Sequence, residues 1–378
     1  MVWTRPETAT SERRLPMKDA TEQLPDEGLA QAWARTRLNE LWARGRAFLG
    51  TEVAVLGGAM SWISERHLVA ALSQAGGFGV LAAGSMPPAL LDAEIKATRA
   101  LLEEGGGQKP FGVNLITMHP ELDTLIDVCL ANQVSHVVLA GGLPSAAAIR
   151  RVKEGGARCV CFAPALALAR KLVRSGADAL VIEGTEAGGH IGPVSTTVLA
   201  QEILPEVHDV PVFVAGGIGR GESIVSFLEM GAAGVQLGTR FVCATECIAH
   251  PNFKKVFLRA SARDAQPTPQ VDPRFPVIPV RALVNKGTQA FVEMQRQVVN
   301  RFQAGEIDQK TGQLEIEHFW AGALRRAVIE GDIETGSLMA GQSVGLVTRE
   351  QPVADIIEEL CEQAVNTLAR RVPPPLSF

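Results

Sequence analysis

ALVIEGTEAGGHIG (179–192), VFVAGGIG (212–219) and VQLGTRFV (235–242) are the three segments of the chain that decide its fold. Each begins with a short run of branched apolar residues and continues into glycines. Strands buried on both faces give such continuous apolar runs, and glycines at their ends are typical of turns into helices. The stretches that follow, 196–205 and 221–230, have helical periodicity. The pattern therefore predicts parallel strands joined by helices.

The same alternation of strand and helix extends back toward the N-terminus. Five further apolar runs predict strands at 53–56, 78–82, 112–116, 136–139 and 159–162. Amphipathic stretches predict helices at 64–74, 89–103, 121–131, 144–153 and 164–174. Eight such units in about 200 residues are the number that a (β/α)8 TIM barrel requires. A doubly wound open sheet is the alternative, but its G-x-G-x-x-G fingerprint is absent after the first strand.

The segments on either side of this alternation have a different character. Residues 1–49 begin with a stretch rich in Pro, Thr and charge that lacks the apolar core of a signal peptide. From Leu29 onward, apolar residues fall roughly on one helical face, which predicts one amphipathic helix packed on the main domain. We expect three regions: an N-terminal extension (1–49), a barrel region (50–258) and a Pro-rich loop with a helical cap (259–378).

The cap is predicted from proline content and helical periodicity. Residues 265–280 contain five prolines, which predict a loop or an extended arm. Apolar periodicity returns in three stretches, which predict helices at 286–303, 317–330 and 352–370. We expect this mainly helical C-terminal cap to cover the barrel mouth.

Composition excludes several classes of protein. The 378 residues are 46% hydrophobic and 20% charged, with a net charge of −5, which argues against disorder and against nucleic-acid binding. No apolar run is long enough for a membrane helix. The six cysteines are scattered, and the spacings of Cys159 with Cys161 and Cys243 with Cys247 are not those of zinc motifs. We expect reduced thiols, no metal site and a cytoplasmic location.

The seven histidines divide by their position relative to the barrel mouth, because catalytic residues of these barrels follow the carboxyl ends of strands. Four are expected at the opposite end or on helices: His67, His136, His208 and His318. Three are expected near the mouth: His119, His190 and His250. His190 has the most unusual surroundings, because two glycines precede it directly after a strand. It is our candidate general acid or base; the alternative is a loop histidine whose glycines only form the turn.

Glycine-rich turns end the two strands that follow His190. Ala215, Gly216, Gly217 and Gly219 end one strand, and Gln236, Gly238 and Thr239 end the next. Both turns place backbone N–H groups where many barrels bind phosphate. We therefore predict a cradle for a phosphorylated cofactor, with tight structural turns as the alternative.

Three further features suggest contacts with a flat ring. Gly58, Ala59 and Met60 form a small-residue turn after the first strand, where a planar ring could lie against the backbone. Asn114 lies within a strand, and its amide can both donate to and accept from a heterocycle. Glu183 ends a buried strand, where an unpaired carboxylate is costly. Asn114 and Glu183 could instead belong to structural hydrogen-bond networks.

The segments EGTEAGGHIG, PVFVAGGIG and GVQLGTRFV together resemble the FMN-dependent family of nitronate monooxygenases, or 2-nitropropane dioxygenases, and enoyl-acyl-carrier-protein reductase II. The resemblance covers about residues 50–350. It implies FMN, with its phosphate on the turns at 216–219 and 238–239, and it matches His190 to the histidine that takes an α-proton from nitroalkanes. The residues themselves and the resemblance together predict these cofactor-binding residues: Gly58, Ala59, Met60, Asn114, Glu183, Gly188, Gly189, Ala215, Gly216, Gly217, Gly219, Gln236, Gly238 and Thr239.

Two C-terminal segments resemble the enoyl reductase branch of that family, at 241–255 and 321–347. The resemblance implies an oxidoreductase that uses NAD(P)H to reduce an activated alkene such as an enoyl thioester. The alternatives are a nitronate monooxygenase using O2, an NAD(P)H:quinone-type reductase, and a non-enzymatic phosphate or nucleotide sensor. Expected partners are a small-molecule or acyl-thioester substrate, an acyl carrier protein and a second copy in a homodimer, with no nucleic acid and no membrane.

Overall fold

A computed structural model describes residues 27–371 of the chain. The Pro-, Thr- and charge-rich start of the N-terminal extension, residues 1–26, lies outside the described residues, as do residues 372–378.

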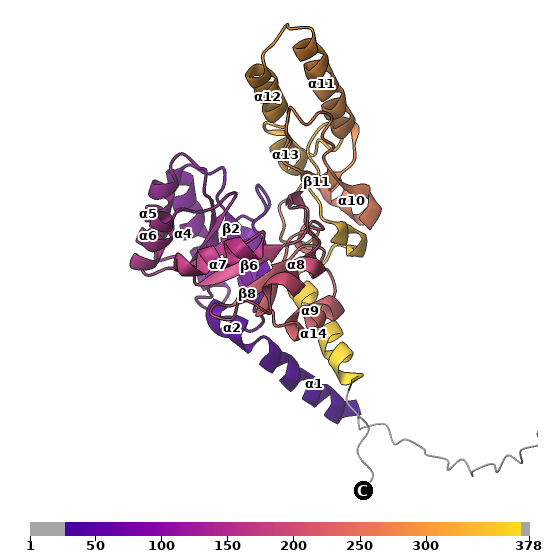
Figure 1. Cartoon of the computed structure of the whole chain (residues 1–378). Helices are drawn as coiled ribbons and strands as arrows, with labels where there is room; N and C mark the ends of the chain where they lie inside the picture. The colour runs from indigo at the N-terminus through magenta and orange to yellow at the C-terminus, as the bar shows by residue number, and fades with distance from the viewer. Residues whose placement is uncertain (1–26, 372–378) are drawn as a thin grey trace, which may run out of the picture.

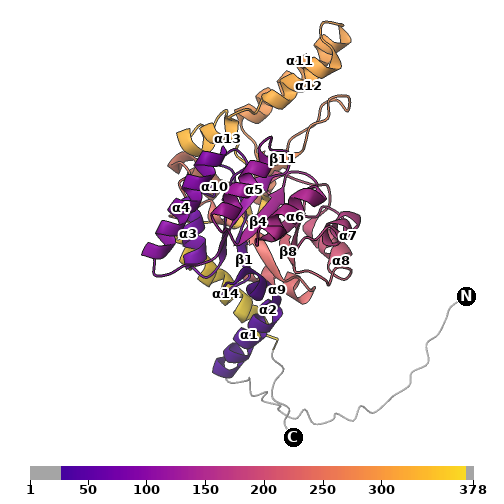
Figure 2. The same ribbon diagram turned by 90° about the vertical axis from the view of Figure 1, so that its left-hand side faces the viewer.

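Eight parallel strands form a closed barrel, which confirms the predicted fold (Figures 1 and 2). They are β1 (Val55–Gly57), β2 (Phe78–Ala82), β3 (Phe111–Ile116), β4 (His136–Ala140), β5 (Arg158–Phe162), β6 (Ala179–Glu183), β8 (Val212–Ala215) and β9 (Gly234–Leu237). β1 pairs with both β2 and β9, which closes the sheet. The predicted strand bounds differ from these by at most two residues.

Seven helices alternate with the strands and cover the outside of the barrel. They are α3 (Arg66–Gln74), α4 (Pro88–Glu104), α5 (Leu122–Ala131), α6 (Ala146–Glu154), α7 (Leu166–Arg174), α8 (Thr196–Ile203) and α9 (Gly221–Glu229). The main core lies between these helices and the strands. A second core fills the barrel interior and includes Phe78, Val160 and Phe213. The strands are therefore buried on both faces, as their continuous apolar runs predicted.

The N-terminal extension closes the end of the barrel where the strands begin. It contains two helices, α1 (Glu27–Leu41) and α2 (Ala43–Leu49), where one amphipathic helix was predicted. Leu49 enters the interior core, and the ring of Phe48 lies against Phe213. Trp42, between the helices, is 2% exposed, whereas Trp33 is 45% exposed and lies off the packed face. α2 therefore fills the end of the barrel at which the strands begin.

The C-terminal helix α14 (Val353–Ala369) returns to the N-terminal extension. It runs beside α1 in Figures 1 and 2, and the Gln31 side chain of α1 donates to the Asn366 Oδ1 of α14 over 2.8 Å. The two ends of the described chain therefore pack together on one side of the barrel.

The cap contains helices and a small sheet. The helices are α10 (Pro251–Arg259), α11 (Lys286–Gln303), α12 (Gln309–His318) and α13 (Ala323–Arg325), followed by a π-helical turn (Arg326–Glu330). α11 and α12 project away from the barrel in Figures 1 and 2. The sheet has three antiparallel strands, β10 (Ala265–Pro267), β11 (Val280–Leu283) and β7 (Gly189–His190). The division of the chain at residues 49 and 258 stays a prediction.

The Pro-rich segment 265–280 is a loop whose extended ends pair as β10 and the start of β11, which is compatible with the predicted loop or extended arm. One prediction for the cap was inaccurate in detail. The helix predicted at 317–330 is interrupted, because Gly322 adopts a left-handed conformation with φ of 70°. α12 ends at His318, and Gly322 stands at the N-cap of α13.

No helix within residues 27–371 is long and apolar enough to cross a membrane. All six cysteines are free thiols, and five of them are buried. Across the same residues, no group of three or more His, Cys, Asp or Glu side chains is arranged to hold a metal ion.

Candidate active site

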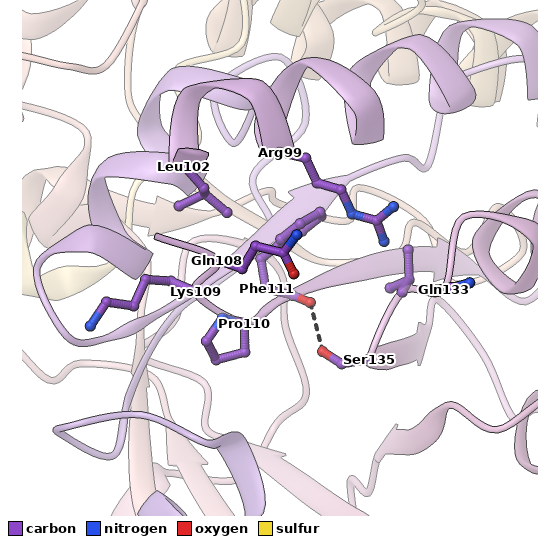
Figure 3. A pocket seen from close by; sticks show the side chains of 9 residues that line it. Arg99, Leu102, Gln108, Lys109, Pro110, Phe111, Gln133 and Ser135 are labelled. Atoms are coloured by element: carbon purple, nitrogen blue, oxygen red, sulfur yellow. Dashed lines mark hydrogen bonds between the residues drawn. The ribbon is translucent and has the colours of Figure 1, made fainter. Parts of the chain in front are cut away.

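Two cavities lie at opposite ends of the barrel. The larger, about 300 Å³, lies beside the starts of β3 and β4 and is lined by Arg99, Lys109 and Ser135 (Figure 3). There Ser135 Oγ donates to the Phe111 carbonyl over 3.2 Å, and the Arg99 guanidinium donates to the Asn132 carbonyl. Barrels of this type do not place their chemistry at this end. Cavity volume alone therefore does not identify the active site.

The second cavity, about 230 Å³, lies at the carboxyl ends of β4, β5 and β6. Its walls include Leu143, Phe162 and Glu183, and Gly192 of the His190 loop completes one side. It is a mainly apolar space with one acid in its wall, at the end where such barrels do their chemistry.

The turn after β8 has the geometry of an anion-binding site. Gly216 and Gly217 have φ of 99° and 73°, values that L side chains rarely adopt. A Cβ at Gly217 would lie 2.9 Å from the Glu186 Cβ, so the position also lacks room. Among the described residues, the N–H groups of Gly216, Gly217, Ile218 and Gly219 donate no hydrogen bond. Successive free N–H groups of this kind attract anions.

The turns after β1 and β9 lie against each other. Gly58 N donates to the Leu237 carbonyl over 2.8 Å, and a Cβ at Gly238 would lie 3.4 Å from the Met60 sulfur. Ser64 Oγ fixes the first turn, because it donates to the Gly58 carbonyl and accepts from Met60 N, at 3.0 and 2.9 Å. The chain thus brings together two turns that are almost 180 residues apart in sequence, about half the length of the chain.

Two buried amides near these turns have unused hydrogen-bonding groups. Asn114 is 7% exposed; its Nδ2 donates to the Val138 carbonyl over 3.2 Å, and its Oδ1 accepts no hydrogen bond from a described residue. Gln236 is 8% exposed, and its whole side-chain amide is without a partner in the same part of the chain. Buried amides normally find partners. These two are therefore available to a polar ligand.

Glu183 is an acid without a counterion. It pairs with Ala215 in the register of β6 and β8, and its side chain makes no hydrogen bond or ion pair with any described residue. Burial alone raises its pKa to about 8. The side chain is therefore mostly protonated at pH 7 and can donate a hydrogen bond into the cavity.

The three histidines predicted near the mouth differ in the hydrogen bonds of their rings. His119 Nδ1 accepts from Glu121 N, and His250 Nδ1 accepts from Asn252 N at the start of α10, both over 3.1 Å. The His190 ring makes no hydrogen bond within the described residues. The ring keeps solvent access, yet the surrounding protein displaces enough water to lower its pKa below 6.5. At pH 7 it is neutral, with one nitrogen able to donate and one able to accept.

The cap holds the loop that carries His190, which sequence analysis did not predict. Val280 of β11 pairs with His190, and Arg281 pairs with Gly189. The Arg281 side chain is 6% exposed; its Nε donates to the Thr185 carbonyl over 2.8 Å and its Nη1 to the Ala265 carbonyl over 2.6 Å. Nothing in the sequence marks Arg281, because these partners lie up to 96 residues away.

A second cap segment contacts the same loop and explains one of its glycines. Gln342 N donates to the Glu186 carbonyl over 2.9 Å, and Gly341 N donates to the Thr239 hydroxyl over 2.9 Å. A Cβ at Gly188 would lie 2.6 Å from Gly341 N. Gly188 was predicted as a cofactor-binding residue; in the structure its missing side chain leaves room for the backbone of the cap.

Glu186 anchors the middle of the loop to the barrel. Its Oε2 accepts from both the backbone N and the hydroxyl of Thr196, at 2.9 and 2.8 Å, at the start of α8. With Arg281 and β11, this contact fixes the loop at three points. The position of His190 therefore depends on both the barrel and the cap.

All the residues predicted for the site lie in, or directly after, the strands that end at the barrel mouth. The structure brings the turns of β1, β8 and β9 to the same end of the barrel as Asn114, Glu183 and His190. Their roles toward a ligand stay predictions. Arg281, Glu186 and Gly341 are additions that only the folded structure shows.

Comparisons with known proteins agree with this architecture. The family model described as nitronate monooxygenase matches residues 44–125 and 121–363. The chain is 28% identical over 355 residues to a (3aS,4S,5R,7aS)-5-hydroxy-7a-methyl-1-oxo-octahydro-1H-indene-4-carboxyl-CoA dehydrogenase of Rhodococcus jostii (strain RHA1), covering 88% of this chain and 97% of that protein. It is 26% identical over 362 residues to a nitronate monooxygenase of Paraburkholderia phytofirmans, covering 82% and 92%.

Among solved structures, FabK from Thermotoga maritima matches with a TM-score of 0.76 and 36% identity, over 86% of this chain and 97% of that one. The family model and this match each cover most of the chain. The chain therefore belongs to the nitronate monooxygenase family, whose members are flavin-dependent oxidoreductases built on a (β/α)8 barrel.

Proposed function

We propose that the protein is an FMN-dependent oxidoreductase that uses NAD(P)H to reduce an activated alkene of the enoyl-thioester class. One observation carries the proposal. Free backbone N–H groups of the Gly216–Gly219 turn lie at the same barrel mouth as unpartnered amides and an unpartnered imidazole. A flavin enzyme needs three things at one place: a site for the phosphate anion, polar groups at the edge of the flavin ring, and a general acid or base.

The residues present fit FMN. Its phosphate would be held by the N–H groups of Gly216, Gly217 and Gly219 and by the Gly238–Thr239 turn, where small side chains leave room. Gln236 and Asn114 would bond the ring edge through the groups that no described residue engages. The Gly58–Met60 turn would lie against the ring face. When bound, FMN supplies the hydride chemistry that no side chain can perform.

The chain itself supplies proton handling and exclusion of water. Because His190 is neutral at pH 7, it can hydrogen-bond a thioester carbonyl or move a proton at the adjacent carbon. Leu143 and Phe162 line an apolar cavity that limits water beside the reacting groups. Protonated Glu183 can donate a second hydrogen bond in that cavity.

The thioester class is supported by what the similar proteins are named for. The Rhodococcus relative and one from Mycobacterium tuberculosis, 29% identical over 362 residues, are both named as carboxyl-CoA dehydrogenases. The resemblance of 241–255 and 321–347 to the enoyl reductase branch points the same way, and it also implies NAD(P)H as the hydride source. The cytoplasmic location, the homodimer and the acyl carrier protein partner belong to this proposal, and the buried free thiols fit a reducing compartment.

Nitronate oxidation is the second candidate function. The lowered pKa of His190 favours it, because a neutral imidazole is the form that takes an α-proton. The nitronate monooxygenase of Paraburkholderia phytofirmans supports the same reading at 26% identity. An NAD(P)H:quinone-type reductase would use the same scaffold.

Anaerobic stopped-flow absorbance on the purified protein tests the proposal. We expect bound FMN, bleaching by NADH or NADPH, and rapid reoxidation by crotonyl-CoA. Bleaching by ethyl nitronate without NAD(P)H would instead assign the second candidate. A protein that binds no FMN when titrated with it would overturn both.

A further inference from the structure

The C-terminal helix α14 contacts the two elements that directly follow the glycine turns of the proposed phosphate cradle. It lies beside α9 and α1 on one side of the barrel (Figures 1 and 2). α9 begins two residues after Gly219, and the short 3₁₀ helix η1 (Thr239–Phe241) begins directly after Gly238. Two polar side chains of α14, Glu359 and Gln363, contact these two elements.

Gln363 contacts the first turn through the start of α9. Its Oε1 accepts from Gly221 N over 2.9 Å. The first N–H groups of a helix have no partner inside the helix, so this contact satisfies one of them. Gly221 also allows the helices to meet backbone to backbone, because a Cβ there would lie 2.2 Å from the Leu360 carbonyl oxygen. The start of α9 is therefore fixed against α14.

Glu359 contacts the second turn through Arg240. Arg240 follows Thr239 in η1 and is 3% exposed. Its Nη2 donates to Glu359 Oε2 over 3.1 Å and to Gln351 Oε1 over 3.4 Å, while its Nε is buried without a partner. A buried guanidinium needs a counter-charge. Among the described residues, Glu359 supplies the carboxylate that pairs with it.

The two contacts are joined on the surface of α14. Gln363 Nε2 donates to Glu359 Oε1 over 3.1 Å, and the two residues are one helical turn apart on the same face. A continuous path of hydrogen bonds therefore runs from Gly221 through Gln363 and Glu359 to Arg240.

We propose that α14 braces the phosphate cradle: the path through Gln363 and Glu359 holds the turns at 216–219 and 238–239 at the spacing that the FMN phosphate requires. The inference rests on the proposed function, since it assumes that FMN binds there. Glu359 and Gln363 are positioning residues that do not touch the phosphate. Backbone donors act on an anion only when they converge, so a change in spacing weakens every contact at once.

The test separates positioning from general stability by comparing FMN with riboflavin, which lacks the phosphate. In Glu359→Gln, which keeps shape but removes charge, we expect the Kd for FMN to rise about tenfold, as for loss of a charged hydrogen bond. The Kd for riboflavin should change by less than about twofold, because no phosphate contact is involved. Fluorescence titration of the flavin-free proteins measures both.

Gln363→Ala is the second variant, because it breaks the Gly221 contact and leaves the Arg240–Glu359 pair intact. We expect a smaller rise in the FMN Kd, about threefold, for loss of a neutral hydrogen bond. Glu358→Gln is the matched control, because Glu358 is exposed on the same helix and forms no ion pair with a described residue. It should leave both affinities unchanged.

Three outcomes decide the inference. An unchanged FMN Kd in both variants would overturn it. Equal weakening of FMN and riboflavin, together with a lower melting temperature of the flavin-free protein, would also overturn it and assign α14 a structural role only. A wild-type protein that binds no FMN would overturn the proposed function instead, so the two failures are distinguishable.

Discussion

The two ends of the barrel each hold a histidine near a cavity, and the two histidines are in opposite situations. At the closed end His136 is 2% exposed, and its ring contacts Ser135 Oγ at 2.9 Å and the Phe48 carbonyl at 3.0 Å. At the mouth, His190 makes no hydrogen bond with any described residue. The larger cavity lies near the satisfied histidine. The unpartnered histidine, and not the larger cavity, therefore lies at the end of the barrel where we propose the active site.

The largest expected effect is at the mouth, from Gly217→Asp. We expect FMN affinity to fall at least about a hundredfold, because a carboxylate would face the phosphate and a side chain would clash with Glu186. Flavin content after purification and fluorescence titration measure it. Gly231→Asp is the control, since Gly231 also has a positive φ of 104° but open space around it. Stoichiometric FMN in Gly217→Asp would show that the turn does not hold phosphate.

His190→Ala should have the next largest effect and should separate chemistry from binding. We expect turnover with the best substrate to fall more than tenfold, as for loss of a general acid or base, with the Kd for FMN unchanged. His119→Ala is the control at the same mouth, because that ring already bonds the backbone of Glu121. Full turnover in His190→Ala would show that the His190 ring is not the general acid or base.

The smallest effect is expected at the closed end and concerns stability. Burial, with a smaller contribution from the charge of Arg158, lowers the pKa of His136 to about 4, against the opposing effects of the Phe48 carbonyl and Asp178. The unfolded chain should titrate near 6.5. The unfolded state therefore binds the proton first, and stability is lost as pH falls from about 6.5 toward 4. We expect a loss of about 2 kcal/mol between pH 7 and pH 5.

Urea unfolding at several pH values checks this prediction. In His136→Gln the loss between pH 7 and pH 5 should be smaller by most of that amount. His190→Ala should reduce the pH dependence less than His136→Gln does, since the ring at the mouth is more accessible. A slope identical in wild type and His136→Gln would contradict the assignment.

The barrel was predictable because its signal is local and repeated. Each buried parallel strand must be apolar on both faces, so runs such as FGVLA at 78–82 and ALVI at 179–182 mark strands without knowledge of their neighbours. Where a single residue breaks a pattern, prediction is less exact. The break between α12 and α13 has no separate signal, because glycine also occurs inside helices and strands elsewhere in this chain, as at Gly287 and Gly112.

The candidate site was predictable where a residue follows a strand and not where it comes from the cap. Strand ends converge in any closed parallel barrel, so His190 and the Gly217 turn could be assigned to one mouth. Arg281 could not, because its role depends on pairing between β11 and β7 across about 90 residues. The roles of Gly188 and Glu359 likewise arise from contacts with segments that are remote in sequence.

The sequence by itself determined the number of barrel strands, their parallel arrangement and the glycine turns at their ends, because hydrophobic burial and backbone sterics act over a few residues. Only the tertiary structure decided which groups stay unpaired at the mouth, that the cap holds the His190 loop and that α14 joins the two turns. Those features depend on hydrogen bonds between segments that are remote in sequence, such as Arg240 and Glu359, which are 119 residues apart. Their pairing is fixed only when the barrel closes.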